Sequence, residues 1–169
     1  PYAWSWFGDH TGRRVELIRF AAVGSLLAAA ALLGVQQAVP VAIVTALLFV
    51  ANSGVVPLSE ATLAHHLSTG QGIDAARYGR VRVWGSIGFI VSVTLFGAVL
   101  QRAGISTFPY LVALMYGLLL VAALRLPATR EEAVHDEPAP AVLPLLKRPE
   151  VAWFFASVFF HVLAHMAVY

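Results

Sequence analysis

The chain has 169 residues, of which 59% are hydrophobic and 12% charged, and its formal net charge is +2. A soluble domain is about 45–50% apolar and about 25% charged, so this composition excludes an ordinary soluble domain and indicates a polytopic membrane protein. The basic residues lie between apolar stretches, which argues against nucleic-acid binding, and the absence of cysteine excludes disulfides and thiolate metal sites.

Apolar segments long enough to cross a bilayer dominate the chain. Residues 1–8 are rich in aromatic side chains, and Trp4 and Trp6 are placed like an interfacial belt at the end of a span. A spanning helix needs about 20 mostly apolar residues, and only helices satisfy their own backbone groups in lipid. Helical spans are therefore predicted for residues 17–35, 40–58, 83–100 and 108–124, with a fifth over residues 151–169.

The basic residues alternate between connectors. Alternate connectors together hold ten of the 11 Lys and Arg residues, and the connectors between them hold only Arg102. The positive-inside rule then places the basic side in the cytoplasm. We expect a multi-pass protein of a bacterial-type cytoplasmic (inner) membrane, and the alternation itself supports the span count.

One long polar connector, residues 127–150, carries five prolines and mixed charge, which predicts a mobile linker. It separates a large apolar block from the fifth segment. Because the chain opens at Pro1 without Met and stops at Tyr169 within an apolar run, we expect a fragment of a longer protein.

Two charges flank the connector between the second and third segments. The residues after Glu60 remain good helix formers as far as Leu67, and Asp74 is a suitable N-cap for the next helix. Glu60 and Arg82 then lie roughly 10–12 Å inside their helix ends. In an antiparallel hairpin this is the same depth, so we predict that the two side chains pair. The alternative is that each is solvated separately at the headgroup level.

Small residues are frequent on both helices of this hairpin and predict close packing of the two backbones. Pro57 should kink its helix or leave a backbone carbonyl without a partner. The small or short polar residues are Asn52, Ser53 and Gly54 on one helix and Gly79, Gly85, Ser86, Gly88 and Ser92 on the next.

Two histidines, His161 and His165, lie four residues apart on one face of the fifth segment. The spacing can hold a metal, but the glutamate of an HExxH signature is missing, since Val162 follows His161. We predict no metal site. His165, and after it His161, is a candidate for carrying a proton or contacting a solute. The alternative is that these side chains only pack against their neighbours.

The stretch Asp9-His10-Thr11-Gly12-Arg13-Arg14 resembles the loop between the second and third helices of the major facilitator superfamily, whose pattern is G-x-x-x-D-R-x-G-R-R. Asp9, Gly12, Arg13 and Arg14 match, whereas Ser5 replaces the glycine and His10 the following basic residue. The resemblance implies that these four matching residues form a loop that bears on conformational gating.

The stretch PLSEATLAHH, followed by YGRVRVWGS, resembles the hairpin of the fourth and fifth helices in proton symporters of the lactose permease type. It is more similar to the phenylpropionate permease branch, whose pattern is Y-G-[KR]-V-R-x-W-G-S and which often has Asp where Glu60 stands. The run HMAVY from His165 resembles the start of the seventh helix in that branch.

Together these features predict an all-α, polytopic transmembrane helical bundle that is a partial major facilitator fold. Residues 1–126 would be an incomplete N-terminal half, from the end of helix two through helix six. Residues 127–149 would be the central cytoplasmic linker, and residues 150–169 the truncated start of the C-terminal half with helix seven.

The function that the resemblance implies is secondary active transport by alternating access. The main hypothesis is proton symport of a small organic solute such as an aromatic acid, and the alternative is symport of a sugar or nucleoside. The expected partners are the solute, a proton and the lipid bilayer, with a monomer, no cofactor, no nucleic acid and no enzymatic activity. The implied solute-binding residues are Glu60, Arg82, Asn52, Trp84 and Ser86.

Two functions of other classes compete with transport. An intramembrane metal-dependent enzyme using His161, His165 and Glu60 predicts stoichiometric bound zinc and inhibition by a chelator. A membrane scaffold without transport activity predicts no solute-driven proton uptake into cells that express the full chain.

Overall fold

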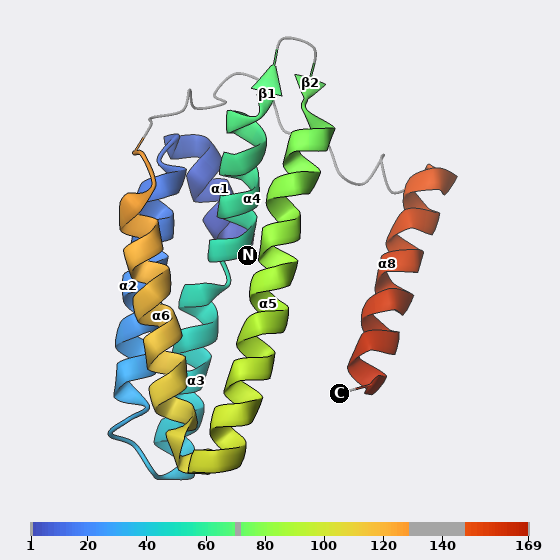
Figure 1. The fold of residues 1–169 in the computed structure, drawn as a ribbon. Coiled ribbons are helices and arrows are strands. Elements are labelled where there is room, and N and C mark those ends of the chain that lie inside the picture. The colour runs from blue at the N-terminus through green and yellow to red at the C-terminus, as the bar shows by residue number, and fades with distance from the viewer. Residues whose placement is uncertain (1, 70–71, 129–147, 169) are drawn as a thin grey trace. The chain divides into compact units, whose positions relative to one another are not determined.

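The computed structural model describes residues 2–69, 72–128 and 148–168, and nearly all of them are helical (Figure 1). The chain divides into two units, residues 1–134 and 135–169. The predicted all-α fold class is confirmed. The first unit holds α1 (Tyr2–Thr11), α2 (Arg14–Ala31), α3 (Ala38–Asn52), α4 (Val55–His66), β1 (Ser68–Thr69), β2 (Gly72–Ile73), α5 (Ala75–Ala103), η1 (Ile105–Thr107) and α6 (Phe108–Arg125), and the second holds α8 (Pro149–Val168).

Helix α2 is the centre of the first unit, because α3, α4 and α6 all pack against it. Its buried positions recur every three or four residues and so form one face of the helix. Three of them are alanines, and such small side chains let neighbouring helices approach closely. Ile18 and Ala22 of α2 meet Leu58 of α4 and Ala123 of α6 in the core. The buried residues of α2 are Val15, Ile18, Ala21, Ala22, Ser25 and Ala29.

The predicted second span is broken into α3 and α4 one turn before Pro57. Proline cannot donate to the carbonyl four residues earlier, and its ring clashes with that carbonyl. Here that carbonyl belongs to Ser53, which follows the last residue of α3, and Pro57 lies in the first turn of α4. The predicted kink at Pro57 is confirmed. It sets the direction in which α4 leaves α3.

The hairpin between α4 and α5 has defined ends. Helix α4 ends at His66, and Asp74 caps α5 as predicted, accepting a hydrogen bond from the Arg77 backbone N–H at 3.0 Å. Strands β1 and β2 pair antiparallel with Ser68 opposite Ile73, a short ladder that the sequence did not predict. The Asp74 N–H also donates to the Leu67 carbonyl at 3.1 Å. The two helices are therefore held at their ends in a fixed register.

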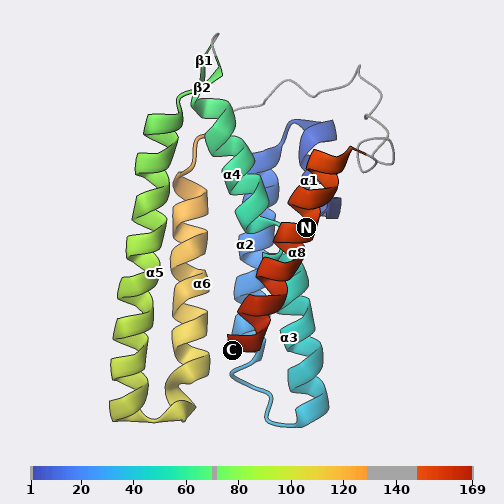
Figure 2. The same ribbon diagram turned by 90° about the vertical axis from the view of Figure 1, so that its right-hand side faces the viewer.

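Helix α5 stands at the edge of the first unit in both views (Figures 1 and 2). It is 29 residues long and has no buried residue. An apolar helix exposed on every side is stable only in an apolar medium. Within the described residues, three stretches are long and apolar enough to cross a membrane: Ala38–His66, Ala75–Ala103 and Ile105–Arg125.

The predicted span over residues 17–35 is the exception. Helix α2 begins earlier, at Arg14, and ends earlier, at Ala31, and its first six residues include Arg14, Glu16 and Arg19. Each of the three candidate spans contains an apolar stretch of 18 residues with at most two charged side chains, whereas the 18 residues of α2 include three. The described part of the predicted fifth span is helical in α8. Most of the predicted linker, residues 129–147, lies outside the described residues.

The charge of Arg19 has a structural explanation. Its guanidinium donates to three backbone carbonyls at the C-terminal end of α6: Ala123 at 3.2 Å, Leu124 at 3.4 Å and Leu126 at 2.8 Å. The last carbonyls of a helix have no partner within the helix, and a cation there also interacts favourably with the helix dipole. Arg19 thus caps α6 from a position 104 residues earlier in the chain.

Replacement of Arg19 by methionine, which keeps the unbranched stem, is expected to lower the free energy of unfolding by about 1.5–3 kcal/mol, as for other charged hydrogen bonds. Thermal unfolding of the purified full-length protein in detergent would show this as a lower apparent Tm. Arg80→Met is the matched control, because Arg80 is an exposed residue of α5. Equal losses in the two variants would contradict the capping role.

The ends of the helices agree with the alternation of basic connectors. Figure 1 shows the α1–α2 turn, the β1–β2 ladder and the end of α6 at one end of the first unit, with the α2–α3 and α5–α6 turns at the other. Arg102 lies in the last turn of α5, and Arg125 in the last turn of α6. Arg102, the one basic residue predicted outside the basic connectors, therefore lies at the opposite end of the first unit from the α1–α2 and α4–α5 connectors.

Candidate functional site

Glu60 and Arg82 form the ion pair that depth matching predicted. The Nη2 atom of Arg82 lies 3.2 Å from Oε1 of Glu60. Glu60 is on the second turn of α4, and Arg82 is two turns into α5, so each charge lies inside its helix, away from the ends that the ladder joins. The side chains are 44% and 60% exposed, respectively. Their charges are thus paired but remain accessible.

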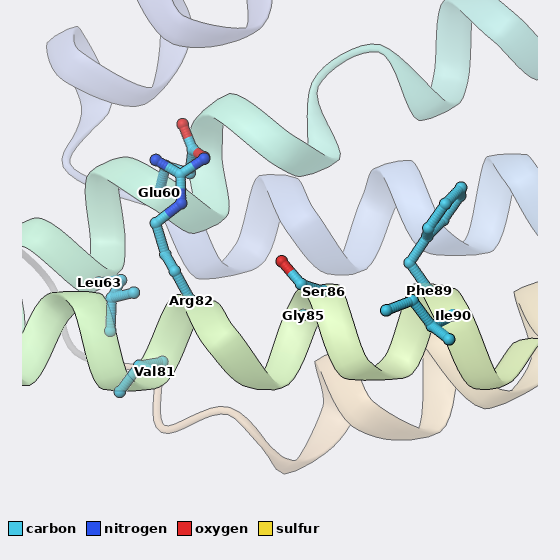
Figure 3. A pocket seen from close by; sticks show the side chains of 8 residues that line it. All are labelled: Glu60, Leu63, Val81, Arg82, Gly85, Ser86, Phe89 and Ile90. Atoms are coloured by element: carbon cyan, nitrogen blue, oxygen red, sulfur yellow. The ribbon is translucent and has the colours of Figure 1, made fainter.

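A groove of about 540 Å³ opens beside the pair (Figure 3). Helix α4 contributes two of its lining residues and α5 the other six. In Figure 3, Arg82 rises from α5 to Glu60 of α4, and Ser86 and Phe89 rise from the same side of α5. The groove is lined by Glu60, Leu63, Val81, Arg82, Gly85, Ser86, Phe89 and Ile90.

The groove combines three kinds of chemistry. Arg82 offers N–H donors in a planar fork, Glu60 offers carboxylate acceptors, and the Ser86 hydroxyl can do either. Leu63, Phe89 and Ile90 add apolar surface. Such a site suits a small organic molecule with an apolar body and a hydroxyl or carboxylate group.

Three of the five predicted solute-binding residues line this groove: Glu60, Arg82 and Ser86. Trp84 lies on α5 but outside the lining, and it is 72% exposed. Asn52 is the last residue of α3 and also lies outside the lining. The structure therefore does not bring Trp84 and Asn52 to the charged pair.

Sequence reasoning missed the apolar part of the lining. Leu63 lies three residues after Glu60, and Phe89 lies seven after Arg82, so both share a helix face with a charged residue. Projecting each helix from its charged residue would have found them. Phe89 is the larger of the two and is 66% exposed.

The predicted gating residues are brought together at the turn between α1 and α2. Arg14 donates from Nη2 to Asp9 at 2.8 Å, and Arg13 lies 3.5 Å from Glu16. Gly12, which follows the last residue of α1, has a φ of 63°, a left-handed conformation that glycine adopts without strain. The turn is thus tied to both helices.

Trp4 makes contacts within the first unit that the sequence did not predict. Its indole N–H donates to the Val50 carbonyl at 3.1 Å, and its ring packs against Gly54 at the break between α3 and α4. Trp6, in contrast, is 45% exposed and stacks on His10, with ring centroids 4.2 Å apart. Trp4 therefore holds α1 against the break.

The predicted histidine pair lies on α8. His161 is exposed, and the side chain of His165 lies outside the described residues. Among the side chains that are described, no three His, Asp or Glu residues gather as metal ligands would.

Comparison with known proteins identifies the family. Residues 1–169 match the sequence pattern of the family described as "MFS_1 like family". The chain belongs to the MFS_1-like family. It is thus a member of the major facilitator superfamily, and with three apolar helices of spanning length it is part of an integral membrane protein.

A maltose permease of Geobacillus stearothermophilus is 33% identical to this MFS_1-like chain over 131 residues. The match covers 73% of the chain and 30% of that permease. No solved structure matches the chain. The relative and the family point to transport rather than enzymatic catalysis.

Proposed function

We propose that the full-length protein is a secondary active transporter that moves a small organic solute across the cytoplasmic membrane by alternating access. The observation that carries this proposal is the Glu60–Arg82 pair, 3.2 Å apart and half exposed to a groove between two apolar helices. A charge within an apolar span is costly and is a functional candidate by default. Family membership supports the same class of function.

Solute binding would proceed by exchange of partners. In the empty site Glu60 and Arg82 neutralise each other, which limits the cost of holding charges in the membrane. A carboxylate or hydroxyl group of the solute would take N–H donors of Arg82 in a forked contact. A solute hydroxyl could in turn donate to Glu60. With a solute that carries a hydroxyl group, both charges would therefore stay partnered through the cycle.

The main hypothesis for the solute is an aromatic acid taken up with a proton. One cation beside Phe89 and Ile90 suits a molecule with an anionic end and an apolar ring. Tyr78, Trp84 and Asn52 would contact such a solute only after the site rearranges. His165, or else His161, is the proposed proton carrier. We also propose that the protein belongs to the phenylpropionate permease branch of the superfamily.

A sugar is the second candidate, and the maltose permease relative favours it. Glu60 would then matter most, because a carboxylate accepts hydrogen bonds from sugar hydroxyls, and Phe89 could pack against the apolar face of the ring. In either case we propose a monomer in a bacterial-type inner membrane, with the α1–α2 turn acting in gating.

The proposal is tested by uptake into cells that express the full-length protein. Radiolabelled aromatic acids, sugars and nucleosides should be supplied with and without an uncoupler that collapses the proton gradient. We expect one class to accumulate and the uncoupler to prevent its accumulation. Accumulation that survives the uncoupler would contradict proton symport, and uptake equal to that of cells with an empty vector for all three classes would contradict the solute assignment.

A further inference from the structure

Arg82 has a second contact besides Glu60. Its guanidinium carbon lies 5.8 Å from the centroid of the Tyr78 ring, within the range of a cation–π interaction. Tyr78 precedes Arg82 by four residues on α5, and long helical side chains lean toward the N-terminus of their helix. Arg82 is therefore directed over Tyr78 by the geometry of the helix itself.

Tyr78 differs from its neighbours on α5. It is half-buried, whereas every other residue from 74 to 91 is exposed. General packing of this part of α5 therefore does not explain why the ring is shielded. The contact with Arg82 gives the tyrosine a specific neighbour beside the charged pair.

We propose that Tyr78 is a positioning residue that keeps the guanidinium of Arg82 at the groove when Glu60 releases it. This inference rests on the proposed function, because it concerns the moment at which a solute replaces Glu60. An arginine side chain that loses its carboxylate is free to leave the groove through its many rotamers. The face of an aromatic ring attracts the cation but takes none of its N–H donors. Those donors stay available to the solute.

The arrangement thus divides two tasks between two partners. Glu60 neutralises Arg82 in the empty site and competes with the solute for the same N–H groups. Tyr78 contacts the flat side of the guanidinium and does not compete. Loss of Tyr78 should therefore weaken solute binding while the steps after binding are unchanged.

Transport kinetics of the full-length protein test this division. Tyr78→Leu should raise the KM for the transported solute roughly two- to fivefold, the range of an exposed cation–π contact, at unchanged maximal rate. Tyr78→Phe keeps the aromatic face and should restore the wild-type KM. Tyr116→Leu is the matched control, since Tyr116 is a half-buried tyrosine of α6 that does not line the groove. An unchanged KM in Tyr78→Leu, or an equal rise in Tyr78→Phe, would overturn the proposal.

A second readout does not depend on transport. In the Glu60→Gln background, phenylglyoxal should modify Arg82 faster in the Tyr78→Leu variant than in the Tyr78→Phe variant or with Tyr78 unchanged, as followed by mass spectrometry of the full-length protein. Equal rates in all three would overturn the positioning role even if uptake is normal. A wild-type protein without uptake but with the expected order of rates would contradict the proposed function and leave the Tyr78–Arg82 contact standing.

Discussion

Uptake should be lost when either Arg82 or Glu60 is replaced by alanine in the full-length protein. Each change removes a partner at 3.2 Å and leaves the other charge alone inside an apolar span. Loss of a charge-assisted contact to the solute and exposure of the unpaired charge together predict a decrease in initial uptake rate of about 100-fold or more. Uptake of labelled solute by intact cells measures it.

The effect should arise in the groove and not in membrane insertion. The protein level in the membrane, measured by immunoblot, is expected to stay close to that of the wild type. Arg80→Ala is the matched control on the same helix, since Arg80 is exposed and does not line the groove. Uptake at the wild-type rate in either Arg82→Ala or Glu60→Ala would show that the pair has no part in transport.

Gly54→Ala is expected to destabilise the first unit by about 1–3 kcal/mol, the usual cost of overpacking. A β-carbon at Gly54 would lie 2.7 Å from Cδ2 and 2.8 Å from Cβ of Trp4, too close for the bulky indole to yield easily. Trp4 is also held by its hydrogen bond to Val50. The collision would push α4 away from α1, and Glu60 would move with α4. Both the apparent Tm and uptake should therefore fall.

A matched glycine and a compensating change separate this mechanism from a general intolerance of alanine. Gly97→Ala places its β-carbon where nothing lies within 4 Å, and removing a helical glycine should be neutral or stabilising by up to about 1 kcal/mol. Trp4→Ala removes Cγ and the ring atoms that crowd the new β-carbon, so the loss of Tm in Gly54→Ala combined with Trp4→Ala should be smaller than the sum of the two single losses. A Tm unchanged by Gly54→Ala would contradict the packing at this break.

Local chemistry made much of the hairpin predictable from the sequence. Asp74 caps α5 through its own side chain, and Pro57 breaks the preceding helix through its own ring, so neither effect needs distant residues. Once those helix ends are known, the depths of Glu60 and Arg82 follow from the rise per residue. The pairing of the two charges could therefore be predicted from local sequence features.

Features that depend on distant contacts could not be predicted. Nothing near Arg19 shows that its partners are carbonyls at the end of α6, and this contact explains why α2 tolerates charge where an apolar span was expected. The packing of Trp4 against Gly54 joins segments 50 residues apart, so the sequence around Trp4 gave no sign of it. The two-residue strands β1 and β2 are too short to carry a periodic pattern.

The most direct test asks whether the transported solute occupies the groove between α4 and α5. The 169 residues contain no cysteine, so Ser86→Cys introduces a single thiol into this part of the full-length protein, with any cysteine elsewhere replaced. Ser86 lines the groove, and Ser106 of η1, the control position for Ser106→Cys, lies outside it. We expect saturating solute to slow the alkylation of Ser86→Cys by N-ethylmaleimide severalfold and to leave Ser106→Cys unaffected. Equal alkylation of Ser86→Cys with and without a solute that the protein transports would contradict the assignment of this groove as the binding site.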